Sequence, residues 1–267
     1  MSASALAGWV RCLAAWLLCT VAGPGVQASE AVRIGALAVL EDEDTQRQWQ
    51  PLVSRLQQAL EEIAGQSARV LDAKASIWLL DAAGQMLSDA VAYRDARTDG
   101  VPERVWQQLS LDEIYRRSGI QFLKFNSLYQ IRALLDEKPA WLDKVTRLLL
   151  IPDYLHYRLT GQFSCEFTNA STSQLVNACS RDWDPELIAL LGEGGKWLQP
   201  IAAPGTRLGH WISPSGRQVS VILPATHDTG SAIVATPLSG RGAAYISSGT
   251  WSLVGVERNA PLTDVAA

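Results

Sequence analysis

The sequence predicts an α/β fold, and three observations lead to this class. Short runs of Val, Ile and Leu alternate with amphipathic helical segments along most of the chain. The 267 residues and the 48% hydrophobic content are enough to bury a sizeable core, in one large domain or two modest ones. At two places an apolar run leads directly into small polar residues, as at the strand ends where α/β proteins bind ligands.

The composition excludes several classes of protein. The net charge is −4 and no basic stripe is visible, so we expect no nucleic-acid partner. Four cysteines are too few for a disulfide scaffold, and Cys165 and Cys179 have neither zinc-knuckle nor redox spacing. Because the chain has only three histidines, we expect no multi-histidine metal centre, and no metal ligand is assigned.

Residues 1–28 have the order of a secretory signal peptide. The lone charge of Arg11 precedes the apolar run 13–22, and small residues at 26–28 suit a signal peptidase. The run is short for a bilayer, so we expect no stable membrane span. The alternative is an apolar N-terminus read from a wrong start codon.

Residues 31–72 predict one strand and one helix. The strand covers 31–40, and the acidic run 41–44 is interpreted as a solvated turn, because calcium-ligand spacing is absent. The helix has one apolar stripe, formed by Trp49, Leu52, Val53, Leu56, Leu60 and Ile63. This part of the chain resembles the opening of a periplasmic phosphonate-binding-type sensor domain.

From about residue 75 a second series of elements follows. Its first half begins with a strand at 77–80 and a turn at 81–84. A core-facing helix is predicted at 125–137, with Asn126 as N-cap. An apolar segment at 148–151 is stopped by Pro152, and a helix at 153–160 is ended by Gly161. Its second half comprises a turn or ligand-lining loop at 168–173, a buried strand at 219–225, a helix beginning at 231, and strands at 242–246 and 252–256 joined by 247–251.

The first polar junction is the run Thr226-His227-Asp228-Thr229. It follows the predicted buried strand, which we expect to end at an exposed cleft carrying Asp228. A carboxylate there can accept a proton from a substrate hydroxyl, and the neighbouring His227 and Thr229 can hydrogen-bond to other hydroxyls. The alternative interpretation is an Asp that caps the next helix, which is a common use of this residue.

The second polar junction is Ser247-Ser248-Gly249-Thr250. Hydroxyls and backbone N–H groups around a glycine can bind phosphate oxygens, but the same residues also suit an ordinary hairpin turn.

Residues 75–267 resemble the FGGY family of carbohydrate kinases, most closely the members that act on L-rhamnulose. The resemblance is carried by residues 92–98, 115–123, 125–130, 152–154 with 158–161, 168–171, 226–229 and 247–253. It implies an actin-like ATPase (ribonuclease H-like) fold, in which two domains close over a cleft. It also implies transfer of the γ-phosphate of ATP, with Mg²⁺, to a sugar hydroxyl.

The resemblance further implies roles for individual residues. Asp228 would be the catalytic proton acceptor, and His227, Asp228 and Thr229 would bind the sugar. Thr250 would contact the ATP phosphates. The small-molecule partners are therefore a sugar and ATP.

The chain also departs from the family pattern. The Asp-x-Gly-type phosphate loop is not found, and Ala73-Lys74 stand where related kinases carry a sugar-contacting Trp-Gly pair. We therefore expect a kinase fold incomplete at both ends, with a junction near 72–76 and no measurable turnover. The expected divisions are a signal peptide at 1–28, a sensor-like segment at 29–74, a sugar-binding domain at 75–240 and the start of a nucleotide domain at 241–267.

Two classes of function stay open. The first is a sugar kinase or a fragment of one, acting on L-rhamnulose or on another sugar of the family. The second is an exported ligand-binding or sensor module that carries the kinase segment as a passenger. The kinase interpretation places the protein in the cytoplasm, whereas the signal peptide predicts export; the oligomeric state is not predicted.

Overall fold

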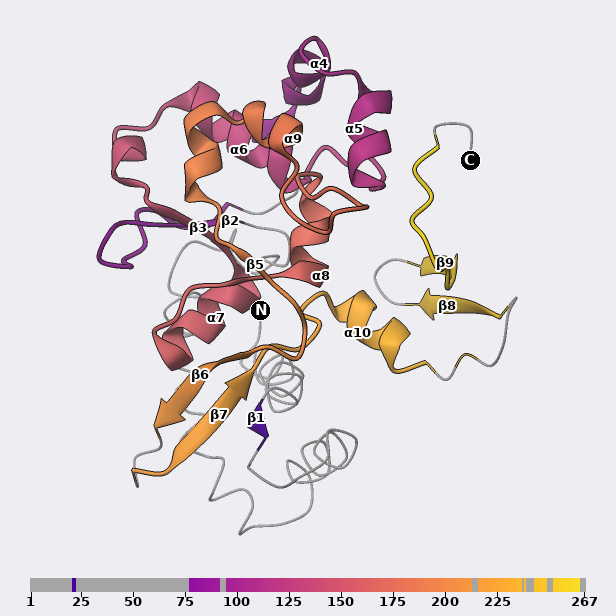
Figure 1. Cartoon of the computed structure of the whole chain (residues 1–267). Coiled ribbons are helices and arrows are strands. Elements are labelled where there is room, and N and C mark those ends of the chain that lie inside the picture. The colour runs from indigo at the N-terminus through magenta and orange to yellow at the C-terminus, as the bar shows by residue number, and fades with distance from the viewer. Residues whose placement is uncertain are drawn as a thin grey trace, which may run out of the picture.

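The computed structural model describes residues 21–22, 77–91, 95–212, 216–236, 238, 243–248 and 252–264. Except for 21–22, everything expected upstream of residue 77 lies outside them, including the signal peptide, the sensor-like segment and the helix with Trp49, Leu56 and Leu60. Helices and strands are mixed through the rest, in line with the α/β class, although they do not strictly alternate (Figure 1).

The elements have the following bounds. They are β1 Val21–Ala22, β2 Ile77–Leu80, η2 Ala96–Thr98, α4 Val101–Trp106, α5 Leu111–Ser118, α6 Ser127–Glu137, η3 Leu142–Lys144, β3 Arg147–Leu150, α7 Ile151–Thr160, β4 Cys165–Glu166, α8 Phe167–Ala170, η4 Ser171–Ser173, α9 Pro185–Ala189, η5 Gly192–Trp197, β5 Ile201–Ala202, β6 Arg207–Ile212, β7 Gln218–Ile222, α10 Asp228–Val234, β8 Ala244–Ser248 and β9 Ser252–Val256.

The antiparallel pair β2–β3 lies at the centre of the core. Trp78 lies opposite Leu149, and all of β2 is buried, which confirms the predicted strand. Because successive side chains of a strand point to opposite faces, Ile77 and Leu79 enter one apolar cluster, whereas Trp78 and Leu80 enter a second.

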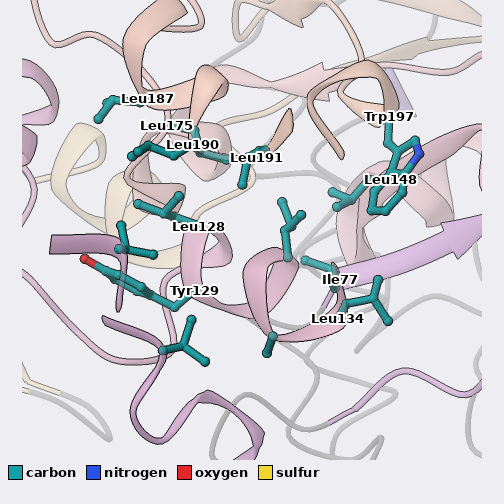
Figure 2. Close-up of a cluster of buried hydrophobic side chains, with 14 of the residues drawn as sticks. Ile77, Leu128, Tyr129, Leu134, Leu148, Leu175, Leu187, Leu190, Leu191 and Trp197 are labelled. Atoms are coloured by element: carbon teal, nitrogen blue, oxygen red, sulfur yellow. The ribbon is translucent and has the colours of Figure 1, made fainter. Parts of the chain in front are cut away.

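The first of these clusters joins the strand pair to the helices above it. Figure 2 shows Leu128 and Leu134 of α6 with Leu187 of α9 and Leu148 of β3 among its members. The predicted helical stripe of 125–137 therefore faces the core, although the helix itself begins at Ser127. Burial of this stripe holds α6 on one face of the β2–β3 pair.

The predicted turn after β2 is confirmed and depends on a glycine. The Gly84 N–H donates to the Asp81 carbonyl at 3.0 Å, and Asp81 Oδ1 accepts the N–H of Ala83 at 2.9 Å. Gly84 has φ +76°, and a Cβ there would lie 2.1 Å from the Tyr157 hydroxyl oxygen. Both the backbone conformation and the close approach require glycine at this position.

Asn126 holds the N-cap position of α6, but its side chain does not cap the helix. Its Oδ1 accepts the N–H of Leu123 at 2.7 Å, and its Nδ2 donates to the carbonyl of Thr172 at 2.9 Å. The residue therefore connects the start of α6 to η4 instead of satisfying a helix N–H group.

The helix α7 starts earlier than predicted. We expected it at 153–160, and it begins at Ile151, with Pro152 in its first turn. Proline is compatible with that position, because its fixed φ suits a helix and its missing N–H is not needed there. Gly161 ends the helix with φ +72°, as predicted.

The strand before the first polar junction is shorter than predicted. β7 ends at Ile222, not at residue 225, and pairs antiparallel with β6 and with β1. Beyond it, the Leu223 N–H donates to the Thr206 carbonyl at 2.9 Å. Only Val221 and Leu223 of the predicted strand 219–225 are fully buried, so its burial is also less complete than expected.

The two predicted strands near the end of the chain form the antiparallel hairpin β8–β9, with Ser248 opposite Ser252. β8 begins at Ala244 rather than at residue 242, and the hairpin follows α10 in Figure 1. Within the part of the chain that the structure describes, no helix is both long and apolar enough to cross a membrane.

Candidate active site

The run 226–229, called the turn below, carries the predicted base and lies where the link 223–227 from β7 meets the start of α10. His227 holds the N-cap position, and Asp228 is the first residue of the helix, three residues before the predicted start. Asp228 Oδ1 accepts the Thr229 N–H at 2.7 Å, and the Asp228 side chain is 47% exposed. The carboxylate is therefore one residue inside the helix, not at the N-cap, and solvent reaches it. The expected cleft around it stays a prediction.

The other two predicted sugar-binding residues flank this carboxylate. His227 Nε2 lies 4.0 Å from Asp228 Oδ1, and the His227 side chain is 34% exposed. Thr229 Oγ1 lies 3.4 Å from the same oxygen. Three side chains able to donate or accept hydrogen bonds are thus neighbours at the start of α10, and their role in sugar binding stays a prediction.

The residue that holds this turn is Glu166, which the sequence analysis missed. Its side chain is fully buried at the end of β4. Glu166 Oε2 accepts the backbone N–H of Thr226 at 2.9 Å and the Thr226 hydroxyl at 2.7 Å. The only local signal was the polar run that follows it, and that run does not indicate a partner 60 residues away.

Glu166 also caps the helix α8. It accepts the N–H groups of Thr168 at 2.9 Å and Asn169 at 3.3 Å, and the Thr168 hydroxyl at 2.5 Å. Thr168 Oγ1 in turn accepts the His227 N–H at 3.1 Å. One buried carboxylate therefore connects the start of α8 to two consecutive residues of the turn.

Residues 168–173 are helical and do not form the turn or ligand-lining loop that we expected. They belong to α8 and η4, and the hydroxyls of Ser171, Thr172 and Ser173 donate to carbonyls three residues earlier, at 2.8, 2.8 and 2.6 Å. Small hydroxyl residues can satisfy backbone carbonyls locally, which is why their pattern resembles that of a loop.

A second buried carboxyl group, Asp153, lies behind Glu166. Asp153 Oδ1 accepts the backbone N–H of Glu166 at 3.0 Å, whereas Oδ2 has no hydrogen-bond partner. Burial raises the pKa of Asp153 well above its ordinary value, and the nearby Glu166 charge raises it further, against the lowering effect of the Glu166 N–H. The group is best accommodated as the neutral acid.

We expect the change Asp153→Asn to be tolerated and to flatten the alkaline side of the stability profile. The raised folded-state pKa means that Asp153 contributes stability below its unfolded pKa and loses it as pH rises through the folded pKa. Asn keeps the Oδ1 acceptor without a titrating group, so at pH 8 the variant should be at least as stable as the parent.

Urea unfolding between pH 5 and 9 measures this effect, with the exposed Asp143→Asn as the control variant. Parallel pH profiles for the parent and Asp153→Asn would contradict the assignment of a neutral buried acid.

Two other residues that could carry chemistry, Thr250 and His156, do not belong to this turn. Thr250, predicted to contact ATP phosphates, is outside the described residues, so the phosphate-binding interpretation of 247–250 stays a prediction. His156 is fully buried, and burial lowers its pKa to about 4, which makes it a neutral core residue. Among the described residues no group of three or more His, Cys, Asp or Glu could hold a metal ion.

Comparisons with known proteins point to one family. The N-terminal domain of the FGGY family of carbohydrate kinases matches residues 39–231. The rhamnulokinase of Yersinia pestis (strain Pestoides F) is 54% identical over 185 residues, covering 69% of this chain and 38% of the relative. That of Pectobacterium atrosepticum is 52% identical over 189 residues, covering 71% of this chain and 38% of the relative. The chain thus spans about 38% of the length of these curated relatives.

A solved structure shares the fold. The carbohydrate kinase from Novosphingobium aromaticivorans aligns with a TM-score of 0.54 and 22% sequence identity, over 71% of this chain and 42% of that one. The family match over residues 39–231 identifies this part of the chain as the N-terminal domain of a carbohydrate kinase. The chain belongs to the FGGY family of carbohydrate kinases.

The family match begins at residue 39, whereas we expected the resemblance to start at about residue 75. The division of the chain at 28, 74 and 240 remains a prediction, and so does the sensor-like segment.

Proposed function

We propose that this chain carries the sugar-binding surface and the proton acceptor of a kinase that phosphorylates L-rhamnulose. The observation that supports it most directly is the half-exposed Asp228 carboxylate at the start of α10, in a chain 52–54% identical to rhamnulokinases over about 70% of its length. The names of those relatives support L-rhamnulose over the other sugars that FGGY kinases could accept.

Asp228 acts in this proposal as the group that orients and deprotonates the sugar hydroxyl. Its Oδ1 already accepts the Thr229 N–H, which fixes the carboxylate relative to the helix. The exposed part of the carboxylate can then accept a hydrogen bond from a hydroxyl group. In phosphoryl transfer such a group works mainly by positioning the nucleophile, because the transition state is loose.

His227 and Thr229 bind neighbouring hydroxyls of the sugar. The His227 imidazole is partly exposed, with Nε2 4.0 Å from Asp228 Oδ1, and Thr229 Oγ1 lies 3.4 Å from that carboxylate oxygen. A ketose presents several adjacent hydroxyls, so a donor and acceptor on each side of the base suits its recognition. Together the three residues select both the position and the orientation of the reacting hydroxyl.

The phosphoryl donor in this proposal is ATP with Mg²⁺, which supplies the electrophilic γ-phosphate and the charge neutralisation that phosphoryl transfer needs. Thr250 would contribute to its phosphate contacts, and the described residues hold no metal cluster of their own. Because ATP is the donor, the cytoplasm is the compartment in which this activity would operate.

The test is the binding of L-rhamnulose to the purified chain, measured by isothermal titration calorimetry. Binding is preferable to turnover as a readout, because turnover also needs nucleotide contacts such as that predicted for Thr250. We expect Asp228→Ala to weaken binding about tenfold or more, the effect of losing a hydrogen bond to a charged group.

The exposed Asp143→Ala serves as the control and should leave the affinity unchanged. Equal affinity of the parent and Asp228→Ala would overturn the site assignment. Tighter binding of D-xylulose or glycerol than of L-rhamnulose would keep the kinase class and overturn the choice of sugar.

A further inference from the structure

We infer that Glu166 is a positioning residue for the phosphoryl acceptor site, because its carboxylate fixes the turn from which Asp228 projects. The role of the turn in sugar binding rests on the proposed function, whereas the fixing of the turn by Glu166 does not. The inference stands on contacts between three segments of the chain, which are β4, α8 and residues 226–227.

The first step is the number and direction of the hydrogen bonds. Glu166 accepts three backbone N–H groups and two hydroxyls, and its side chain has no exposed surface. Four of these five donors contact Oε2 and the Thr168 N–H contacts Oε1, so this carboxylate, which only accepts, is the centre of the network. Hydrogen bonds to a charged acceptor are also stronger than those between neutral groups, particularly inside a protein.

The second step is the position of the bonds within the turn. Thr226 donates its N–H and its hydroxyl to Glu166 Oε2, and His227 donates its N–H to Thr168 Oγ1. Since the Thr168 hydroxyl donates its own hydrogen to Glu166, both consecutive N–H groups of the turn depend on this carboxylate. Asp228 is the next residue, so its backbone direction is set by these anchors.

The third step separates positioning from helix capping. Capping α8 needs only the N–H groups of Thr168 and Asn169, which lie two and three residues after Glu166. The two bonds from Thr226 cross 60 residues of sequence and add nothing to that cap. They do define where the start of α10 lies relative to α8.

From the other side, the first turn of α10 is held by Ser231. Its N–H donates to the His227 carbonyl at 2.9 Å, and its hydroxyl donates to the Ala225 carbonyl. The turn is thus fixed before and after Asp228, and the hydrogen bonds to Glu166 and Thr168 connect it to β4 and α8. Loss of that connection should loosen the turn without unfolding the β2–β3 core.

The experiment compares Thr226→Val and Glu166→Gln with the parent chain. Val has the shape of Thr without the hydroxyl, and Gln keeps one oxygen acceptor but places an NH₂ group against a donor. The matched control is Thr98→Val, because Thr98 is also buried but its hydroxyl has no hydrogen-bond partner. Thr226→Ser, which restores the hydroxyl, is the conservative rescue.

Two readouts are followed, namely amide hydrogen exchange by NMR and the affinity for L-rhamnulose. We expect exchange at residues 226–229 to accelerate about tenfold or more in Thr226→Val and Glu166→Gln, while the amides of α6 keep the parent rate. The affinity for L-rhamnulose should fall several-fold in the same variants. Thr226→Ser and Thr98→Val should match the parent in both readouts.

Each result bears on a different statement. Unchanged exchange at 226–229 in both variants would overturn the positioning role, and so would an equal acceleration in α6, which would reveal a general loss of stability. Accelerated exchange with an unchanged sugar affinity would also overturn it, since the fixed turn would then be irrelevant to binding. If the parent binds no L-rhamnulose while the turn still responds, the proposed function fails and the anchoring of the turn by Glu166 stands.

Discussion

Replacing Trp78 with alanine is expected to lower the free energy of unfolding by about 3–5 kcal/mol, the cost of emptying a buried aromatic site. Trp78 is 1% exposed in the middle of β2, and its ring stacks on Tyr154 with centroids 5.4 Å apart and planes 10° apart. Domains of this size have a net stability of about 5–15 kcal/mol, so this single change should bring the chain close to unfolding.

Urea denaturation followed by far-UV circular dichroism measures this loss. Two further variants make the experiment specific. Trp78→Phe should cost less than about 2 kcal/mol, because one aromatic ring is kept at the site and the buried indole N–H, which has no partner, is removed. Val234→Ala, at a side chain 81% exposed, should change stability by less than about 0.5 kcal/mol. Similar losses for Trp78→Ala and Val234→Ala would contradict the burial of Trp78.

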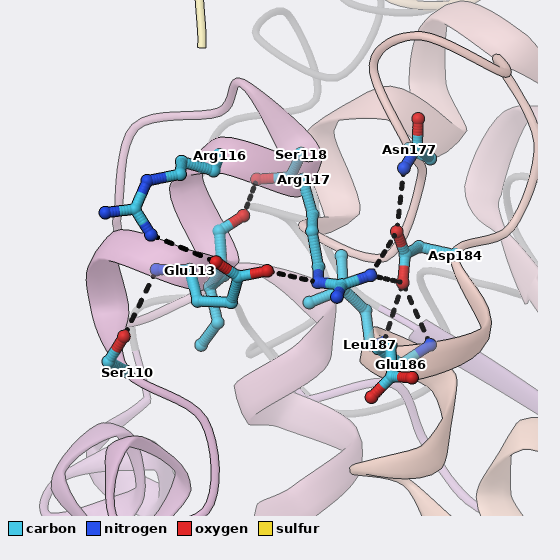
Figure 3. Close-up of polar contacts among 10 residues, drawn as sticks. Ser110, Glu113, Arg116, Arg117, Ser118, Asn177, Asp184, Glu186 and Leu187 are labelled. Carbon is cyan, nitrogen blue, oxygen red and sulfur yellow. Dashed lines mark hydrogen bonds and ion pairs between the residues drawn. The ribbon is translucent and has the colours of Figure 1, made fainter. Parts of the chain in front are cut away.

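The second large effect is expected for Asp184→Asn. Asp184 is fully buried at the N-cap of α9, where it accepts the N–H groups of Glu186 at 2.9 Å and Leu187 at 3.1 Å. It also accepts hydrogen bonds from Asn177 at 2.8 Å and from Arg117 at 3.3 Å, as Figure 3 shows. Asn cannot accept all of these hydrogen bonds, because its NH₂ group faces a donor, whereas Arg117 keeps Glu113 as a counterion; we therefore expect a loss of about 1–3 kcal/mol.

The effect should depend on pH in a defined direction. Burial raises the pKa of Asp184, but the hydrogen bonds from Asn177 and Leu187 and the charge of Arg117 outweigh it, so the pKa is lowered. A lowered folded-state pKa contributes stability above the unfolded pKa and loses it as pH falls through the folded value. The parent should therefore lose stability on acidification, and Asp184→Asn should lose less.

Glu113→Gln is the control for this measurement, because Glu113 contacts the same arginine at 2.9 Å from a more exposed position. An exposed ion pair of this kind is worth about 0–1 kcal/mol. Thermal or urea unfolding at pH 4 and pH 7 compares the two variants. A loss for Glu113→Gln as large as that for Asp184→Asn would show that burial does not set the strength of these contacts.

The parts of the fold that could be predicted are those determined by nearby residues. The turn at 81–84, the end of α7 at Gly161 and the core-facing stripe of α6 follow from glycine chemistry and helical periodicity. The hairpin β8–β9 was likewise indicated by two apolar runs around a polar loop. In each case the pattern that predicts the feature consists of residues close to one another in the sequence.

The parts that could not be predicted depend on residues distant in the sequence. The pairing of Leu79 with Leu148 and the contact of Glu166 with Thr226 leave no periodic signal in the chain. The start of α10 was also misplaced: the helix begins at Asp228, two residues after the contact of Thr226 with Glu166, which leaves no signal in the sequence. Asp228 stays a predicted base: its sequence pattern alone did not separate a base from a helix cap, and the structure places it one residue after the N-cap position.

The contact between Glu166 and Thr226 also has a consequence for the order of events during synthesis. Thr226 follows Glu166 by 60 residues, and the ribosome adds about 5–20 residues per second. Thr226 is therefore made about 3–12 s after Glu166. During that interval the carboxylate lacks two of its donors and keeps water in their place, since an unpaired charge resists burial. The two bonds from Thr226 can therefore form only after the cap of α8 can, because the donors of that cap follow Glu166 by two and three residues.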